Sequence, residues 1–268
     1  MSIQVQQMFA SIAPAYDRTN SVLSLGIHHI WRKKTVQAAG AKPGMKILDC
    51  ATGTGDLAFA FKSTVGDSGT VIGTDFCPEM METGPAKSKA KQLHVDFEVA
   101  DAMNLPYPDN SFDVASISFG IRNVDDPSIA LREMARVVKS GGKVVILEFG
   151  QPKGMMGALY EWYSRHIIPV IGGILTGNKE AYQYLPRTAA TFPCREEFLS
   201  LMNNTGMYQE SSFQELTFGI AFLYTGIVNE ICFHHHVFNH KFFLFRSTNI
   251  SRKRTGIYRR YSNSEAIT

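Results

Sequence analysis

The residues best suited to chemistry lie in a short glycine-rich segment at 49–56, which reads Asp-Cys-Ala-Thr-Gly-Thr-Gly-Asp. The apolar run at 46–50 predicts a strand before it, and the residues after it favour a helix. Gly53 and Gly55 have no Cβ, so the backbone there can adopt positive φ and lie against a ligand. The helix N-terminus also offers free N–H groups. This segment therefore predicts a cofactor-binding loop; a glycine turn without a ligand is the alternative.

Two cofactors fit this loop when it is considered by itself. The GxGxxA pattern at 53–58 matches the dinucleotide fingerprint, and Asp75 lies about where the ribose-binding acid of that fingerprint is expected. However, an acidic residue lies at or just after the end of three successive predicted strands, at Asp49, Asp75 and Asp101. Carboxylates would repel a pyrophosphate and attract a cationic ligand. The three acids therefore favour S-adenosylmethionine.

Each acid has an expected role toward this cofactor. Asp49 would face the cationic amino acid head group, and Asp75 would accept hydrogen bonds from the two ribose hydroxyls. Asp101 would face the adenine amino group, with the small side chain of Ala102 beneath the ring. The alternative for Asp75 is the N-cap of a helix that starts near Pro78.

A second polar feature, Arg122-Asn123, follows the predicted strand 112–118, which should break at Gly120. A cation and an amide at this place could polarise or help to deprotonate a substrate hydroxyl, and we expect both to be catalytic. The alternative is a solvated loop in which Arg122 makes a surface ion pair.

Composition bounds the class of protein. The 268 residues are 44% hydrophobic and 19% charged, which is typical of a soluble globular protein with one large α/β domain. The four cysteines have no paired CxxC spacing, so we expect neither a zinc site nor a disulfide scaffold. The first residues resemble no export or import signal, which predicts a cytoplasmic protein.

Strands and helices are expected to alternate along the chain. Such alternation predicts a parallel sheet with helices on both faces and a ligand crevice at the carboxyl ends of the strands, where Asp49, Asp75, Asp101 and Ser118 fall. A last helix at 193–206 and an antiparallel hairpin of 208–213 with 216–228 would close the sheet. The other predicted strands are 46–50, 70–74, 94–99, 112–118 and 143–149, and the other predicted helices are 56–63, 78–90 and 127–139.

Two further segments are expected beside the crevice. Residues 1–40 have the spacing of two or three helices, and we interpret them as a lid, with simple packing as the alternative. Residues 152–186 are apolar and contain several glycines, which suits an insertion that walls a lipid-like substrate as well as it suits core packing.

Over residues 5 to 228 the chain resembles the S-adenosylmethionine-dependent C-methyltransferases of menaquinone and ubiquinone biosynthesis. The resemblance implies a Rossmann-like, seven-stranded class I methyltransferase sheet, mostly parallel with an antiparallel last strand. It also implies that Thr54, Asp75, Asp101, Ala102 and Ser118 contact the cofactor. The segments that carry it include Met8-Phe9, Tyr16-Asp17, Leu48-Asp49, Thr54-Gly55-Asp56-Leu57, Ser118-Phe119-Gly120-Ile121-Arg122-Asn123-Val124 and Leu147-Glu148-Phe149.

The resemblance further implies a polyprenylated quinol substrate. We expect demethylmenaquinol, and the alternative is the 2-methoxy-6-polyprenyl-1,4-benzoquinol of ubiquinone biosynthesis. Arg122 would correspond to the family's proposed base-assisting arginine. A small-molecule methyltransferase and an NAD(P) oxidoreductase are weaker alternatives. For partners, we expect peripheral contact with the inner face of the membrane and no binding of nucleic acid. Both a monomer and a homodimer are compatible with the sequence.

The chain departs from the family at two places. Thr52 stands where many relatives have glycine, which would alter the loop without removing the site. Residues 229–268 match nothing in the family and carry seven Lys/Arg against two Asp/Glu. We expect this tail to be disordered, with a basic arm for anionic lipid as the alternative. Its histidines have no acidic or Cys partner, so we expect no metal site; they are His234, His235, His236 and His240.

Overall fold

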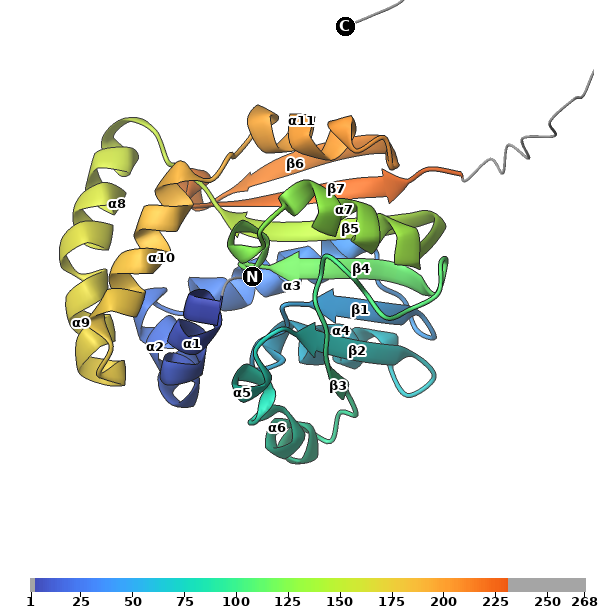
Figure 1. Cartoon of the computed structure of the whole chain (residues 1–268), viewed down its shortest axis with the longest axis horizontal. Helices are drawn as coiled ribbons and strands as arrows, with labels where there is room; N and C mark the ends of the chain where they lie inside the picture. Colours follow the sequence, from blue (N-terminus) through green and yellow to red (C-terminus); the bar gives the residue numbers. More distant parts are fainter. Residues whose placement is uncertain (1–2, 231–268) are drawn as a thin grey trace, which may run out of the picture. The chain divides into compact units, whose positions relative to one another are not determined.

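A computed structural model of the chain describes residues 3–230 (Figure 1). Nearly all of the predicted tail, including its four histidines, lies outside the described residues.

Within the described residues, seven strands form one sheet in the order β3-β2-β1-β4-β5-β7-β6. Strands β1 to β5 pair in parallel with one another, and β7 runs antiparallel to its two neighbours, β5 and β6. The predicted sheet with an antiparallel last strand is therefore confirmed. The strands are β1 (Lys46–Cys50), β2 (Thr70–Asp75), β3 (Asp96–Val99), β4 (Phe112–Ser118), β5 (Val138–Phe149), β6 (Tyr208–Leu216) and β7 (Ala221–Val228).

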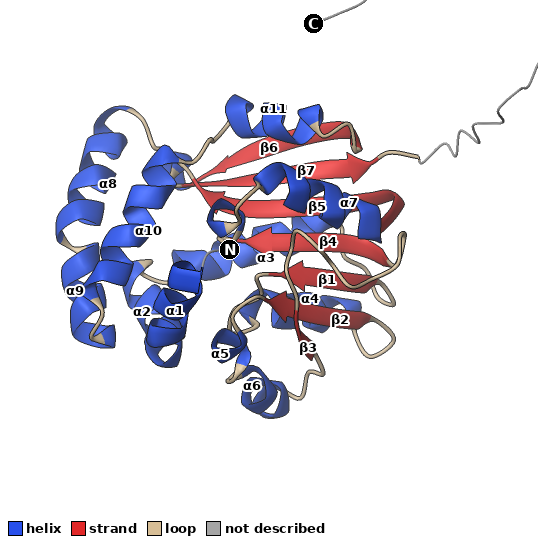
Figure 2. Ribbon diagram, in the orientation of Figure 1, coloured by secondary structure: helices blue, strands red, loops and turns tan. Residues whose placement is uncertain are grey.

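Helices cover both faces of the sheet (Figure 2). Apolar residues of α3 (Ile27–Ala39) and α4 (Asp56–Val65) pack on one face, in a cluster that includes Trp31 and Phe61. Residues of α7 (Pro127–Val137) and α11 (Glu196–Asn204) pack on the other face, in a cluster that includes Leu131 and Phe198. The sheet is thus buried on both faces, as a mostly parallel sheet requires.

Two further groups of helices lie beyond the carboxyl ends of β1, β2, β4 and β5 (Figure 1). They come from the N-terminal segment and from the segment after β5. The first group is α1 (Ile3–Ile12), η1 (Ala13–Ala15) and α2 (Tyr16–Leu23), and the second is α8 (Gly154–His166), α9 (Ile168–Thr176) and α10 (Lys179–Thr191). We call these two groups the helical cover.

The structure differs from the predicted elements in three places. The predicted helix 78–90 is two short helices, α5 (Pro78–Met81) and α6 (Gly84–Lys91), because Gly84-Pro85 starts a new helix. Strand β5 begins five residues earlier than predicted, since Val138 already pairs with Phe112. The segment 152–186, which was predicted to be an insertion with no assigned helices, contains α8, α9 and most of α10.

Candidate active site

The glycine-rich loop joins β1 to α4 and has the backbone that its sequence predicts. Gly53 and Gly55 adopt φ of 57° and 83°. A Cβ at Gly55 would lie 2.7 Å from the Phe97 ring, so only glycine fits there. The Thr52 N–H donates to the Thr74 carbonyl at 2.9 Å, which fastens the loop to β2. No side chain caps the first turn of α4, so its N–H groups face the loop without a side-chain partner.

Asp49 is buried at the end of β1 beneath this loop. Its carboxylate accepts hydrogen bonds from the hydroxyls of Thr52 at 2.7 Å and Ser116 at 2.6 Å. Burial raises the pKa of Asp49 to about 6, although both hydroxyls lower it, and the nearby charge of Asp75 raises it further. Thr52, the departure from the family pattern, therefore holds a site acid and leaves the loop intact.

Asp75 ends β2 and is also buried. Its two oxygens accept from the N–H groups of Gly53 and Cys77, each at 2.9 Å. Burial raises the pKa of this carboxyl, and these backbone donors oppose the rise. The N-cap of α5 is Cys77, so the interpretation of Asp75 as a helix cap is wrong. A carboxylate oxygen accepts more than one hydrogen bond, which leaves capacity for ribose hydroxyls.

The other predicted cofactor residues lie along the same edge of the sheet. Ala100 donates its N–H to the Asp75 carbonyl at 3.1 Å, which places Asp101 and Ala102 directly beside the end of β2. The Asp101 carboxylate accepts from the Met103 N–H at 2.9 Å. Ser118 ends β4, the strand on the other side of β1. Parallel register thus brings the three acids, the loop and Ser118 to one place.

These residues fit a cationic ligand. Asp49 and Asp75 are both buried, and each has a raised pKa because its charge is poorly solvated. A positively charged ligand would relieve that cost, whereas a pyrophosphate would increase it. The electrostatics of the site therefore agree with S-adenosylmethionine, which carries a sulfonium and an ammonium group.

Arg122 is not the solvated loop charge of the alternative interpretation. It lies on the short helix η2 (Ile121–Asn123) after β4, and its Nη1 is 2.6 Å from Oε1 of Glu148 at the end of β5. Both side chains are only 2% exposed. Nη1 also donates to the Phe119 carbonyl at 2.7 Å, while the buried Nε has no hydrogen-bond partner among the described residues. The structure thus fixes a buried cation with a free donor.

Polar side chains of the helical cover lie near this cation. The Tyr184 hydroxyl of α10 donates to the Asn123 side-chain oxygen at 3.3 Å. Burial raises the pKa of Tyr16, Tyr160 and Tyr184, and the positive charge of Arg122 partly lowers each of them. The three tyrosines come from α2, α8 and α10, so side chains from three helices of the cover lie within the electrostatic influence of Arg122.

The N-terminal part of the cover is closed onto the cofactor loop. The Thr54 hydroxyl donates to Oδ1 of Asp17 at 2.5 Å, and Lys87 forms ion pairs with both Asp17 and Asp56. Gln6 of α1 donates to the Phe76 carbonyl at 3.2 Å, beyond the end of β2. These contacts agree with a lid that reaches the cofactor residues directly.

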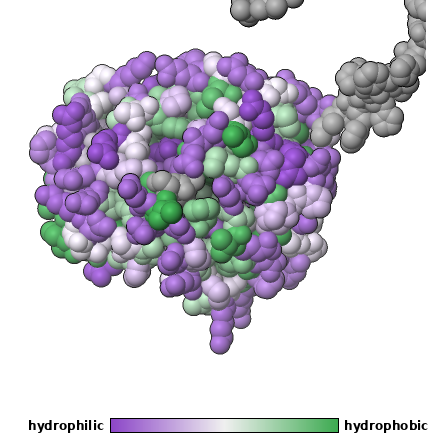
Figure 3. Space-filling model, in the orientation of Figure 1, coloured by the Kyte–Doolittle hydropathy of each residue, from purple (hydrophilic) through white to green (hydrophobic). Residues whose placement is uncertain are grey.

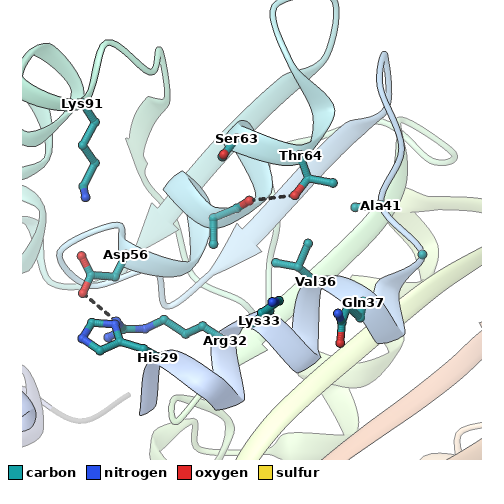
Figure 4. Close-up of a pocket in the computed structure, with 12 residues that line it drawn as sticks. His29, Arg32, Lys33, Val36, Gln37, Ala41, Asp56, Ser63, Thr64 and Lys91 are labelled. Atoms are coloured by element: carbon teal, nitrogen blue, oxygen red, sulfur yellow. Dashed lines mark hydrogen bonds and ion pairs between the residues drawn. The ribbon is translucent and has the colours of Figure 1, made fainter. Parts of the chain in front are cut away.

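A separate pocket of about 520 Å³ lies between α3 and α4, outside the predicted site (Figure 4). Its wall includes Arg32, which forms an ion pair with Asp56 at 2.9 Å, and Lys33 and Lys91. None of the predicted cofactor or catalytic residues lines it. The site is therefore defined by the strand ends and the loop, and this pocket is a surface feature beside α4.

Sequence reasoning gave no role to two residues, Ser116 and Glu148, that hold a site acid and the cation. Ser116 and Glu148 face inward from central strands and bind Asp49 and Arg122. Glu148 had a visible signal, because it is a lone acid at the end of the apolar run Val-Val-Ile-Leu. Ser116 had none, since a serine in a buried strand is common.

Solved structures with this architecture include S-adenosylmethionine-dependent methyltransferases. One from Aquifex aeolicus has a TM-score of 0.55 at 20% identity and covers 74% of this chain and 89% of its own. A phosphoethanolamine N-methyltransferase from Haemonchus contortus, solved with S-adenosylmethionine, has a TM-score of 0.52 at 16% identity and covers 70% and 50%. The fold is thus that of the class I methyltransferases.

Closer relatives specify the family. The chain belongs to the ubiE/COQ5 methyltransferase family, whose model matches residues 1–228. A ubiquinone/menaquinone biosynthesis C-methyltransferase UbiE from Bdellovibrio bacteriovorus is 58% identical, over 84% of this chain and 95% of its own length. A demethylmenaquinone methyltransferase from Deinococcus radiodurans is 44% identical, over 83% and 91%. The enzyme is a C-methyltransferase and its cofactor is S-adenosylmethionine, as the strand-end acids predicted, rather than a dinucleotide.

Proposed function

We propose that this enzyme methylates a ring carbon of a polyprenylated hydroquinone and converts demethylmenaquinol to menaquinol. The observation that carries the proposal is the Arg122–Glu148 pair, a fixed and buried cation on the short helix that follows Ser118 at the end of β4. The name of the Deinococcus radiodurans relative, which refers to the demethylmenaquinone step, supports this substrate.

The cofactor residues have separate tasks in this proposal. Bound S-adenosylmethionine supplies an electrophilic methyl group. Asp49 would hold its ammonium group, Asp75 its ribose hydroxyls and Asp101 its adenine amino group. Thr54 and Ser118 would line the same crevice, and Gly53 and Gly55 would let the backbone approach.

Arg122 would act on the quinol. A hydroquinone ring carbon becomes strongly nucleophilic when a neighbouring hydroxyl loses its proton. The guanidinium lowers the pKa of that hydroxyl and stabilises the phenolate, while Asn123 or a water takes part in moving the proton. The activated ring carbon would accept the methyl group that bound S-adenosylmethionine supplies, with S-adenosylhomocysteine as the leaving group. Loss of the ring C–H proton restores aromaticity.

The protein contributes alignment as well as charge. Holding two reactants in a reactive geometry can supply roughly 7–11 kcal/mol of barrier reduction in the best cases. Here Glu148 fixes Arg122, and Tyr184 contacts Asn123, so neither group needs to reorganise during the reaction.

Product analysis tests the proposal directly. The purified enzyme would be incubated with S-adenosylmethionine and a panel of demethylated naphthoquinols and benzoquinols, and the products identified by mass spectrometry. We expect one added methyl group on the naphthoquinol ring, with S-adenosylhomocysteine formed in equal amount. Methylation of a non-quinone acceptor, or of benzoquinols alone, would contradict the assignment.

We also propose that the enzyme works in the cytoplasm at the inner face of the membrane, where a polyprenylated substrate resides. Among residues 3–230, every helix is too short or too polar to cross a bilayer.

A further inference from the structure

Helix α8 presents an apolar face that no other described part of the chain covers. Met155, Leu159 and Trp162 are 91%, 57% and 54% exposed. Their spacing of four and three residues places them on one side of the helix. Single exposed apolar side chains are ordinary on protein surfaces, but three on one helix face indicate an interaction surface.

Neighbouring elements carry further exposed apolar side chains. Val170 and Ile174 are exposed one turn apart on α9, and Leu25 is 84% exposed in the turn between α2 and α3. Leu25 adopts φ of 48°, a left-handed conformation that leucine rarely adopts. The Tyr163 hydroxyl of α8 donates to the Leu23 carbonyl at 2.9 Å, so that turn lies against α8. Figure 3 shows hydrophobic surface at the left edge of the molecule, over α9.

Charge is distributed unevenly between the helical segments and the rest of the domain. The helical cover, residues 3–23 and 154–191, carries four Lys/Arg and three Asp/Glu. Residues 24–153 and 192–228 carry 16 Lys/Arg and 19 Asp/Glu. The net charge is therefore +1 for the cover and −3 for the rest of the domain. A negatively charged surface would repel the rest of the domain and not the cover, which favours an approach with the helical cover forward.

We propose that Met155, Leu159, Trp162, Val170, Ile174 and Leu25, here called the docking face, insert into an anionic lipid bilayer. This inference rests on the proposed function, because a polyprenylated quinol is found in lipid. A second copy of the chain is a poorer occupant of the face, since it would separate these helices from the lipid that holds the proposed substrate.

Docking in this way would connect the membrane to the site. A pocket of about 550 Å³ lies between α8 and α10, and its wall includes Tyr160, Pro169 and Pro186. Tyr160 is also one of the tyrosines that feel the charge of Arg122. The docking face and this pocket share α8 and α9, so a prenyl chain could pass from lipid toward Arg122 along the inner side of the same helices.

Vesicle binding tests the proposal with the full 268-residue chain, so that residues 231–268 are present in every variant. Co-sedimentation would be measured with phosphatidylcholine vesicles that contain 30% phosphatidylglycerol. We expect Leu159→Ser/Trp162→Ser to bind about tenfold more weakly or worse, because two apolar side chains no longer enter the lipid. The matched control is Val99→Ser/Ile129→Ser, which alters two exposed apolar residues elsewhere and should bind as the wild type does.

Trp162 provides a second readout. The chain has two tryptophans, and Trp31 is buried. Vesicles of brominated lipid should quench the wild-type fluorescence, and Trp162→Phe should remove that quenching while it preserves binding. Unchanged binding of the Leu159→Ser/Trp162→Ser variant, or no quenching of the wild type, would overturn the proposal. So would light scattering that shows a wild-type dimer converted to a monomer by the double substitution, since the face would then bind another copy.

Failure of the docking face can be told apart from failure of the proposed function. The double variant should methylate a short-chain, water-soluble demethylated quinol at the wild-type rate, and lose activity only toward a long-chain quinol in vesicles. If the wild type binds vesicles through Trp162 but methylates no quinol, the docking face stands and the proposed reaction is wrong.

Discussion

Substitution of Glu148 by Gln separates the structural from the catalytic part of the buried ion pair. The two charged atoms are 2.6 Å apart and both side chains are 2% exposed, so Glu148→Gln leaves a buried guanidinium without its counter-charge. Removing one partner of a buried pair costs about 3–5 kcal/mol. In a domain of this size each kcal/mol lowers Tm by roughly 2–4 °C. We therefore expect Tm to fall by about 6–20 °C.

Removing both charges should have a different result. Arg122→Met/Glu148→Leu replaces the pair by apolar side chains and is expected to recover most of the lost stability, because neither charge then needs to be desolvated. It does not restore the cation that holds the phenolate. The rate of methyl transfer should stay about 100-fold or more below the wild-type rate. Arg122→Lys should recover part of it, since an ammonium lacks the planar fork of donors.

Two measurements are needed for each variant. Thermal unfolding followed by circular dichroism gives Tm, and rapid-quench single turnover with demethylmenaquinol gives the chemical rate, with the cofactor Kd determined separately by calorimetry. The control is Glu161→Gln, because Glu161 pairs with Arg165 at 2.6 Å on the exposed side of α8. An exposed pair of this kind contributes within about 0.5 kcal/mol. A wild-type chemical rate in the double variant would refute the catalytic role of Arg122.

Three further predictions concern the cofactor loop and its lid. The usual pKa of Asp49 is 3.8 and burial raises it to about 6, so the folded state binds a proton that the unfolded chain has released. The stability of the ligand-free enzyme should therefore fall as pH rises from about 4 to 6, and thermal unfolding of Asp49→Asn should show a smaller fall, because the carboxyl of Asp75, whose pKa is also raised, is still present. Asp75→Ala should weaken cofactor binding by about 1.5–3 kcal/mol in calorimetry, and unchanged affinity in a folded variant would contradict the ribose role. Asp17→Asn should speed cofactor release by roughly 2–10-fold in stopped-flow experiments, because the lid loses an ion pair, and a wild-type release rate would show that the lid does not retain the cofactor.

A fourth prediction concerns the glycines themselves. Gly55→Ala should lower Tm more than Gly177→Ala, although both residues adopt the left-handed αL conformation. A Cβ at Gly55 meets the Phe97 ring, while a Cβ at Gly177 meets nothing within 4 Å. Equal losses of stability would mean that conformational strain alone decides the cost.

Those parts of the site that depend on local pattern could be predicted from the sequence. An apolar run followed by closely spaced glycines specifies a strand and a turn within about ten residues, so the loop at Gly53 and Gly55 was placed correctly. Asp49, Asp75 and Asp101 could be brought together because successive parallel strands end at the same edge of a sheet. No further information was needed for that step.

Contacts between distant residues were beyond this reasoning. Arg122 and Glu148 are 26 positions apart, and they meet only because Ser118 pairs with Leu147 in the register of β4 and β5. The register of two strands cannot be read from the sequence of either strand alone. The ion pair was therefore not predicted, and a solvated Arg122 was kept as the alternative interpretation. The helices after β5 were obscured in another way. Pro186 lies inside α10 and glycines interrupt α8 and α9, which hides their helical period.

The two edge strands of the sheet have a consequence for solubility in a crowded cell. An edge strand offers unpaired backbone groups to any other extended chain, and so invites aggregation. Both edges here carry two carboxylates, Asp96 and Glu98 on β3 and Glu210 and Glu215 on β6. Pairing of like edges from two molecules would bring these charges together, and their repulsion opposes it. Crowded copies of this domain are thereby discouraged from joining their sheets into fibres.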